Sequence, residues 1–136
     1  MATTPRKRSP AAVVPPPLHE LESEVMEQLW RSGEASVRSV MDALNQRTKK
    51  ERAYTTYMTI MARLHKKGML VRRREGKTDY YTPAYERDQY MALRSQSQVE
   101  GLVEQYGEVA LSHFAQQIAS LDPARRRALQ RLARKA

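Results

Sequence analysis

A helix pattern followed directly by a hairpin pattern constrains the fold of this chain more than any other feature. Tyr54–Lys67 has apolar residues at helical spacing, and Gly68 stands where a left-handed residue would end a helix. Two short β-prone runs follow, 69–74 and 79–82, joined by a four-residue loop that contains a glycine. Pro83 lacks the backbone donor that a strand ladder needs, so it ends the second run. The segment therefore predicts a helix and a β-hairpin wing.

The predicted helix has two chemically different sides. At 100° per residue, one side is apolar and the other carries hydroxyls and positive charges. The apolar side, which we expect in the core, consists of Tyr57, Ile60, Met61 and Leu64. The opposite side, which we expect to be exposed, consists of Thr55, Thr59, Ala62, Arg63 and Lys66, with Thr56 on the border. Met58 also lies on a border. We interpret Met58 and Met61 as core-packing residues rather than as part of a metal site.

Apolar periodicity predicts further helices on both sides of this segment. Two precede it, one from Leu18 to near Gly33 and one capped by Ser36, and three follow it, with breaks at Gly107 and before Pro123. The glutamates of the first helix, which we interpret as a solvated face, are Glu20, Glu22, Glu24 and Glu27. The expected fold class is mainly α with a small β-hairpin wing. It comprises a winged helix-turn-helix at 18–83 and a helical dimerisation region at 84–136, whose exposed apolar stripes a second copy would cover.

Residues 1–17 have the composition of a disordered basic arm. They hold five of the seven prolines and the cluster Arg6–Arg8, without hydrophobic periodicity. Such an arm either touches DNA, as minor-groove arms do, or contributes only nonspecific charge.

Positive charge is concentrated around the helix and hairpin. The chain has a net charge of +9 and a pI of about 10.1, which favours a polyanionic partner such as nucleic acid. Between Arg47 and Lys77 there are 11 basic and 2 acidic residues, whereas 18–46 and 78–121 each contain six acidic and two basic residues. The anion-binding face should therefore be local.

The remaining composition argues against other classes of protein. The chain contains no cysteine, and its three histidines lack metal-ligand spacing. We find no nucleophile motif and no glycine-rich phosphate loop, so we expect no enzyme activity, no catalytic residues, no metal and no cofactor. Without a membrane-spanning run or a signal peptide, the expectation is a soluble cytoplasmic protein without membrane contact.

Helix-turn-helix geometry assigns a role to each part of the helix and wing. Helix 54–67 would enter the major groove, with the preceding helix bracing it. The hydroxyls and methyls suited to reading bases, thymine methyls included, are those of Thr55, Thr56 and Thr59. The cations suited to phosphates are Arg63 and Lys66 on the helix and Arg72, Arg74 and Lys77 on the wing.

Several strings resemble those of the penicillinase repressors, also called the BlaI and MecI repressors. Two of these strings begin at Leu21-Glu22 and at Val37-Arg38. The third and most specific string begins with Ala53-Tyr-Thr-Thr and ends with Lys-Lys-Gly68, and the fourth is Tyr80-Tyr-Thr-Pro83. The resemblance implies a homodimeric repressor on a palindromic operator. It also implies inactivation through a sensor-protease pathway that leads to cleavage near His113 and Phe114. Family members often cleave between asparagine and phenylalanine, and His113 departs from that pattern.

Two other functions remain open on the residues. A basic RNA- or ribosome-associated protein would use the same charge, although the chain offers few aromatic platforms for single-stranded bases. A winged-helix regulator released by direct ligand binding would keep DNA recognition and change only the switch.

Overall fold

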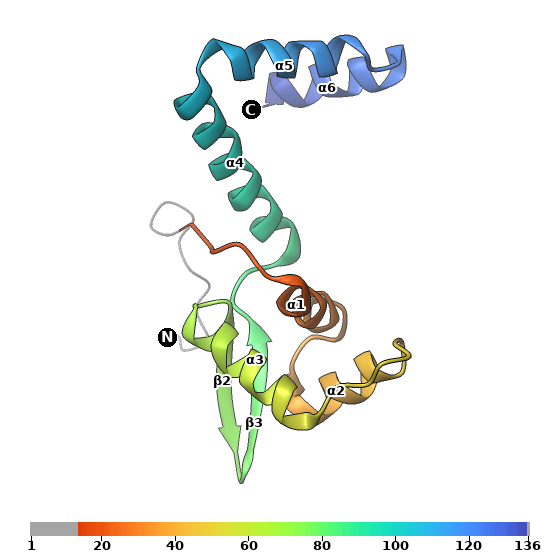
Figure 1. Ribbon diagram of the computed structural model, residues 1–136, viewed down its shortest axis with the longest axis vertical. Coiled ribbons are helices and arrows are strands. Elements are labelled where there is room, and N and C mark those ends of the chain that lie inside the picture. The colour runs from red at the N-terminus through yellow and green to blue at the C-terminus, as the bar shows by residue number, and fades with distance from the viewer. Residues whose placement is uncertain (1–13, 136) are drawn as a thin grey trace. The chain divides into compact units, whose positions relative to one another are not determined.

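The computed structural model describes residues 14–135 (Figure 1). The chain divides into two compact units, one ending at Ser95 and one beginning at Gln96. The first unit, called the head below, contains α1 (Glu20–Ser32), β1 (Ala35–Ser36), α2 (Val37–Asn45), α3 (Tyr54–Lys66), β2 (Leu70–Glu75), β3 (Thr78–Pro83) and the start of α4 (Arg87–Tyr106). The second unit contains the end of α4, α5 (Glu108–Ala119) and α6 (Pro123–Lys135). The fold is a winged helix with C-terminal helices, as expected.

The ends of the head helices follow from local chemistry. Ser36 caps α2, because its hydroxyl accepts a hydrogen bond from the backbone N–H of Ser39 at 3.2 Å. Gly68 has a φ of +85° just after α3, a conformation that a side chain would strain. Both boundaries were predicted from the sequence.

The sheet has three antiparallel strands in the order β1-β3-β2. Glu75 pairs with Thr78 at the tip of the wing, so the turn contains only Gly76 and Lys77 and is tighter than the expected four-residue loop. The strand β1, which the sequence did not indicate, adds Ala35 opposite Tyr81 and Ser36 opposite Tyr80. It joins the start of α2 to the base of the wing.

The core of the head lies between its helices and this sheet. Tyr57, Ile60, Met61 and Leu64 are all buried, which confirms the predicted inner face of α3. They pack with residues from α1, α2 and the wing, chiefly Val25, Met26, Leu29, Val40, Met69, Tyr81 and Tyr85. Met58 was predicted wrongly, because it is 43% exposed on the border of the helix.

Glu22 also departs from prediction, since it is buried rather than solvated. Its side chain is only 1% exposed, and its carboxylate accepts hydrogen bonds from the backbone N–H of His19 at 2.9 Å and from Lys67 Nζ at 2.8 and 3.0 Å. Burial raises the pKa of Glu22, but the hydrogen bonds from His19 and Lys67 outweigh burial and leave the pKa lowered. Glu22 therefore joins α1 to the end of α3.

Residues 14–17, the last part of the expected arm, lie against the start of α4. Pro15 is buried, its carbonyl accepts a hydrogen bond from Arg94 at 3.3 Å, and the carbonyl of Pro16 accepts one from the Tyr90 hydroxyl at 3.2 Å. Residues 14–17 were therefore wrongly expected to be disordered, because proline rings bury apolar surface while their carbonyls remain good acceptors. The rest of the arm, residues 1–13, lies outside the described residues.

The three helices of the second unit begin and end at residues with a clear local role. Gly107, with a φ of +60°, separates α4 from α5. The Asp122 carboxylate accepts from the Arg125 N–H at 2.8 Å and so caps α6. Within residues 14–135, every helix falls short of the combined length and apolar content needed to cross a bilayer.

Candidate nucleic-acid interface

The outer side of α3 presents most of the predicted reading residues together. One shallow hollow of about 340 Å³ is lined by Thr55, Thr56, Thr59 and Arg63, together with Ile60. Thr55, Thr59 and Arg63 are exposed, and Thr56 is half-buried. The hydroxyls and one guanidinium therefore share a single open surface.

Positive charge gathers at the C-terminal end of α3. Arg63, His65 and Lys66 lie in its last turn, where the helix dipole favours cations. Arg63 and Lys66 are exposed, whereas His65 faces inward: its Nδ1 lies 3.1 Å from the Leu70 carbonyl. His65 is thus a packing residue.

The wing separates its arginines onto two sides, because successive strand residues alternate. Arg72 and Arg74 stand on the same side as Leu70 and pair across the strands with Tyr81 and Asp79. Both arginines are exposed, as is Lys77 in the turn. Arg74 lies 3.8 Å from Asp79, an exposed ion pair that solvent screens. The three predicted wing cations are therefore accessible.

Arg73, on the other side of the wing, is already engaged. Its guanidinium donates to Glu34 at 2.9 and 3.0 Å, contacts Glu75, and lies 4.9 Å from the centre of the Tyr80 ring. The hydrogen bonds that Arg73 donates to Glu34 and then to Glu75 raise the pKa of Arg73. The hydrogen bond from Arg73, with the Arg73 charge, outweighs the opposing effect of desolvation and leaves the pKa of Glu34 lowered. Arg73 is therefore held on this side of the wing by carboxylates and an aromatic ring.

A polar groove of about 510 Å³ lies between the start of α3 and the wing. Its walls come from α2, α3 and β3 and include Ser36, Arg38, Tyr54, Met58, Lys77 and Thr78. Arg38 lies 5.7 Å from the centre of the exposed Tyr54 ring, a cation–π arrangement. Sequence reasoning missed Arg38, because it lies outside the basic run and on a different helix from Tyr54.

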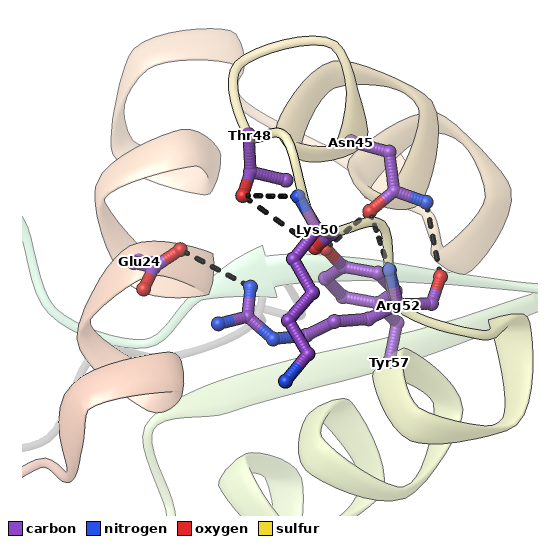
Figure 2. A network of polar contacts seen from close by, with 6 residues as sticks. All are labelled: Glu24, Asn45, Thr48, Lys50, Arg52 and Tyr57. Carbon is purple, nitrogen blue, oxygen red and sulfur yellow. Dashed lines mark hydrogen bonds and ion pairs between the residues drawn. The ribbon is translucent and has the colours of Figure 1, made fainter.

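The loop before α3 is braced by one side chain (Figure 2). Asn45 accepts a hydrogen bond from the Arg52 N–H at 3.1 Å and donates one to the Arg52 carbonyl at 3.0 Å. The same Asn45 oxygen accepts from the buried Tyr57 hydroxyl at 2.9 Å. Arg52 in turn reaches Glu24 of α1 at 3.6 Å. Asn45 thus connects the end of α2 to the start of α3. It therefore helps to fix the position of the first turn of α3, which carries Thr55 and Thr56.

Residues 14–135 contain no group of three or more histidine or acidic side chains placed to hold a metal ion. The hollow and groove described above present hydroxyls, aromatic rings and cations. A surface of this composition can bind phosphates and hydrogen-bond to base edges.

Comparison with known proteins shows which family contains this chain. The model of the family described as "Penicillinase repressor" matches residues 18–135, nearly all of the part of the chain that the structure describes. The chain belongs to the penicillinase repressor family. Members of this family are DNA-binding transcriptional repressors with a winged helix, and this chain is therefore a DNA-binding transcriptional repressor.

Individual relatives of this penicillinase repressor are also similar over most of its length. Transcriptional regulator BlaI of Mycobacterium tuberculosis is 35% identical over 118 residues, covering 85% of this chain and 84% of its own, in two strains. Among solved structures, the BlaI of Bacillus licheniformis, in monomeric form with the blaP half-operator, is 29% identical. That likeness has a TM-score of 0.47 and covers 56% of this chain and 90% of the other. The DNA-binding domain of the repressor BlaI is 28% identical, with a TM-score of 0.49. This match covers 57% of this chain and 92% of the other.

Proposed function

We propose that this chain represses transcription in the cytoplasm by binding a palindromic operator as a homodimer. In this proposal, residues 18–83 are the DNA-binding domain and residues 84–136 form the dimerisation region. Each α3 lies in a major groove and each wing lies on the flanking backbone. A dimer of this kind matches the two-fold symmetry of a palindrome.

The side chains divide this work by chemistry. Thr55, Thr56 and Thr59 offer hydroxyls that can donate or accept and methyls that can pack on thymine. Arg63 and Lys66 on α3, and Arg72, Arg74 and Lys77 on the wing, hold phosphates. The observation that carries the proposal is the shared hollow on the outer side of α3, where three threonines and Arg63 lie together.

The test compares operator and random duplexes. Replacing Thr55, Thr56 and Thr59 together by alanine should lower operator affinity by about tenfold or more and leave random-duplex affinity nearly unchanged, since each base contact contributes roughly 1–3 kcal/mol of discrimination. Ser32→Ala, which removes an exposed hydroxyl from the end of α1, is the control and should have no effect on either. Equal affinity of the wild-type protein for RNA and for its operator would instead favour the RNA-associated alternative.

Inactivation is proposed to follow a sensor-protease pathway with cleavage between His113 and Phe114. Both residues lie within α5, His113 exposed and Phe114 half-buried. A protease needs extended backbone, so this helix must open locally before the bond is cut. Phe114→Ala should block cleavage in induced cells while the intact protein still binds its operator. Release of intact protein by an added small molecule would favour the ligand-regulated alternative.

A further inference from the structure

The exposed side of α3 has a different depression along each of its two borders. The shallow hollow lies along one border, where Thr56 lines it. The polar groove lies along the other border, where Tyr54 and Met58 line it. At 100° per residue, Thr55 and Thr59 fall between these two borders. A molecule that contacts the exposed threonines therefore has the hollow on one side and the groove on the other.

The dimensions of DNA would bring both borders of α3 close to its backbone. An α-helix with its side chains is about 10–12 Å across, and the major groove of B-DNA is about 12 Å wide. A helix in the major groove, with Thr55 and Thr59 toward the bases, therefore meets a sugar–phosphate strand along each border. The polar groove beside Tyr54 and Met58 lies where one of these strands would pass.

The polar groove carries more positive than negative charge. Arg38 of α2 and Lys77 of the wing turn both line it and are exposed, and neither takes part in an ion pair among residues 14–135. Asp79 also lines the groove, but its carboxylate lies 3.8 Å from Arg74, which offsets its charge. The charge of the groove therefore favours an anionic strand.

Arg38 is held at this groove by an aromatic ring rather than by a carboxylate. Its guanidinium carbon lies 5.7 Å from the centre of the Tyr54 ring. A ring face orients a guanidinium, but it leaves the charge uncompensated and the N–H donors free for an acceptor. Arg73 shows the contrast, because the carboxylates of Glu34 and Glu75 already accept its hydrogen bonds. Arg38 is therefore positioned and still available for a phosphate.

We propose that the polar groove binds one sugar–phosphate strand of the DNA duplex, with Arg38 donating to a phosphate and Tyr54 holding Arg38 in place. Lys77 borders the same strand from the wing. Met58, which is 43% exposed, packs against a deoxyribose. The inference rests on the proposed function, in which α3 lies in the major groove, and it adds Arg38 and Tyr54 to the residues that hold DNA.

A DNA strand fits the groove better than a small anion or a protein segment does. A small anion would use the cations but would not account for their position beside the exposed threonines of α3. A protein segment would leave Arg38 and Lys77 unpaired unless it were itself acidic. A duplex accounts for the cations, the groove and the adjacent threonines together.

The test measures binding of the full chain to a random-sequence duplex, because a backbone contact carries no direct sequence information. Arg38→Gln should weaken binding by about five- to tenfold at about 0.1 M salt. It should also reduce the magnitude of the slope of log K against log salt by about 0.9 for each copy bound. Arg38→Lys keeps the charge and should retain the slope. Arg31→Gln is the matched control, since Arg31 is exposed in the last turn of α1, and it should change neither quantity.

Variants of Tyr54 separate positioning from direct contact. Tyr54→Phe keeps the ring and should bind as the wild type does. Tyr54→Leu removes the ring and should weaken binding by about two- to fivefold, the effect of an exposed cation–π contact. Adding Tyr54→Leu to Arg38→Gln should cause no further loss, because the ring acts through Arg38. Circular dichroism at the temperature of the binding measurement checks that every variant is folded.

Three outcomes would overturn this inference. The first is a salt slope that Arg38→Gln leaves unchanged or that Arg31→Gln reduces equally. The second is a loss confined to the operator, which would make Arg38 a base contact. The third is a Tyr54→Phe variant as weak as Tyr54→Leu, which would assign the contact to the hydroxyl. Equal affinity of the wild type for operator and random duplex would refute the proposed function, whereas a reduced slope for Arg38→Gln would still support the backbone contact.

Discussion

Lys67 Nζ lies 2.8 Å from the buried carboxylate of Glu22, and this pair joins the end of α3 to α1. Lys67→Met leaves a buried carboxylate without its cation and should lower the free energy of unfolding by about 1–3 kcal/mol. The side chain of Lys67 is 28% exposed, so we expect the lower part of that range. Urea unfolding followed by circular dichroism measures the effect. Combining Lys67→Met with Glu22→Leu should cost less than the sum of the two single changes, and strict additivity would argue against coupling.

Glu22 should also make the head sensitive to acid. Its folded-state pKa is lowered, so its contribution is fully present above the unfolded pKa near 4.5 and is lost as the pH falls through the folded pKa. Glu22→Gln should therefore flatten the acid side of a stability-versus-pH curve below about 4.5. Glu34→Gln is the comparison, because Glu34 also has a lowered pKa but is exposed, and it should change the curve much less. Identical curves for the two variants would contradict the special role of Glu22.

Asn45 should control how the recognition helix is presented. Asn45→Ala removes both hydrogen bonds to Arg52 and the acceptor of the Tyr57 hydroxyl, and should cost about 1–3 kcal/mol of stability. Tyr57→Phe removes only the last bond and should cost about 1 kcal/mol. Operator affinity, measured by fluorescence anisotropy at a temperature where both variants are folded, should fall more for Asn45→Ala. Equal affinities would show that the loop brace does not affect reading.

The wing makes a prediction about salt. Each phosphate contact contributes about −0.9 to the slope of log K against log salt, so Arg74→Gln and Lys77→Gln should each reduce the magnitude of the slope by about that amount. Arg73→Gln is a matched control, because Arg73 is held by Glu34 and Glu75 on the other side of the wing. It should leave the slope unchanged and lower stability instead. A slope that responds to Arg73 rather than Arg74 would reverse the assignment of the two sides.

The contacts of residues 14–17 predict a difference between two truncations. Removing residues 1–17 should destabilise the head more than removing residues 1–13, because Pro15 is buried and the Pro15 and Pro16 carbonyls accept from Arg94 and Tyr90. Thermal unfolding of the two shortened proteins measures this difference. Comparison of the 1–13 deletion with the full chain on DNA also tests the arm: a reduced salt slope would indicate phosphate contacts by Arg6–Arg8.

What could be predicted from sequence was governed by local rules. The inner side of α3, the cap at Ser36 and the helix stop at Gly68 each depend on residues within one or two turns, and all three were confirmed. Glu22 was missed because periodicity places any charged residue outside, while its partner Lys67 lies 45 residues away.

Other parts of the site also required tertiary structure. The groove lined by Arg38 and Tyr54 forms only when α2 packs beside α3. The strand β1 has only two residues, too few to show an alternating pattern in the sequence. On α3, Thr55, Thr59 and Arg63 could be grouped in advance because a helix repeats regularly. Their role as base and phosphate contacts stays a prediction.

Ser36 belongs to two structures at once, because it pairs with Tyr80 in the sheet and caps α2 with its side chain. The connection between α1 and α2 therefore has a fixed length. One extra residue there would either shift β1 by one position, exchanging the inward and outward sides of the strand, or pull the cap away from the helix. Evolution can vary the exposed surface of α3 and the wing one side chain at a time, but insertions and deletions must occur outside this connection.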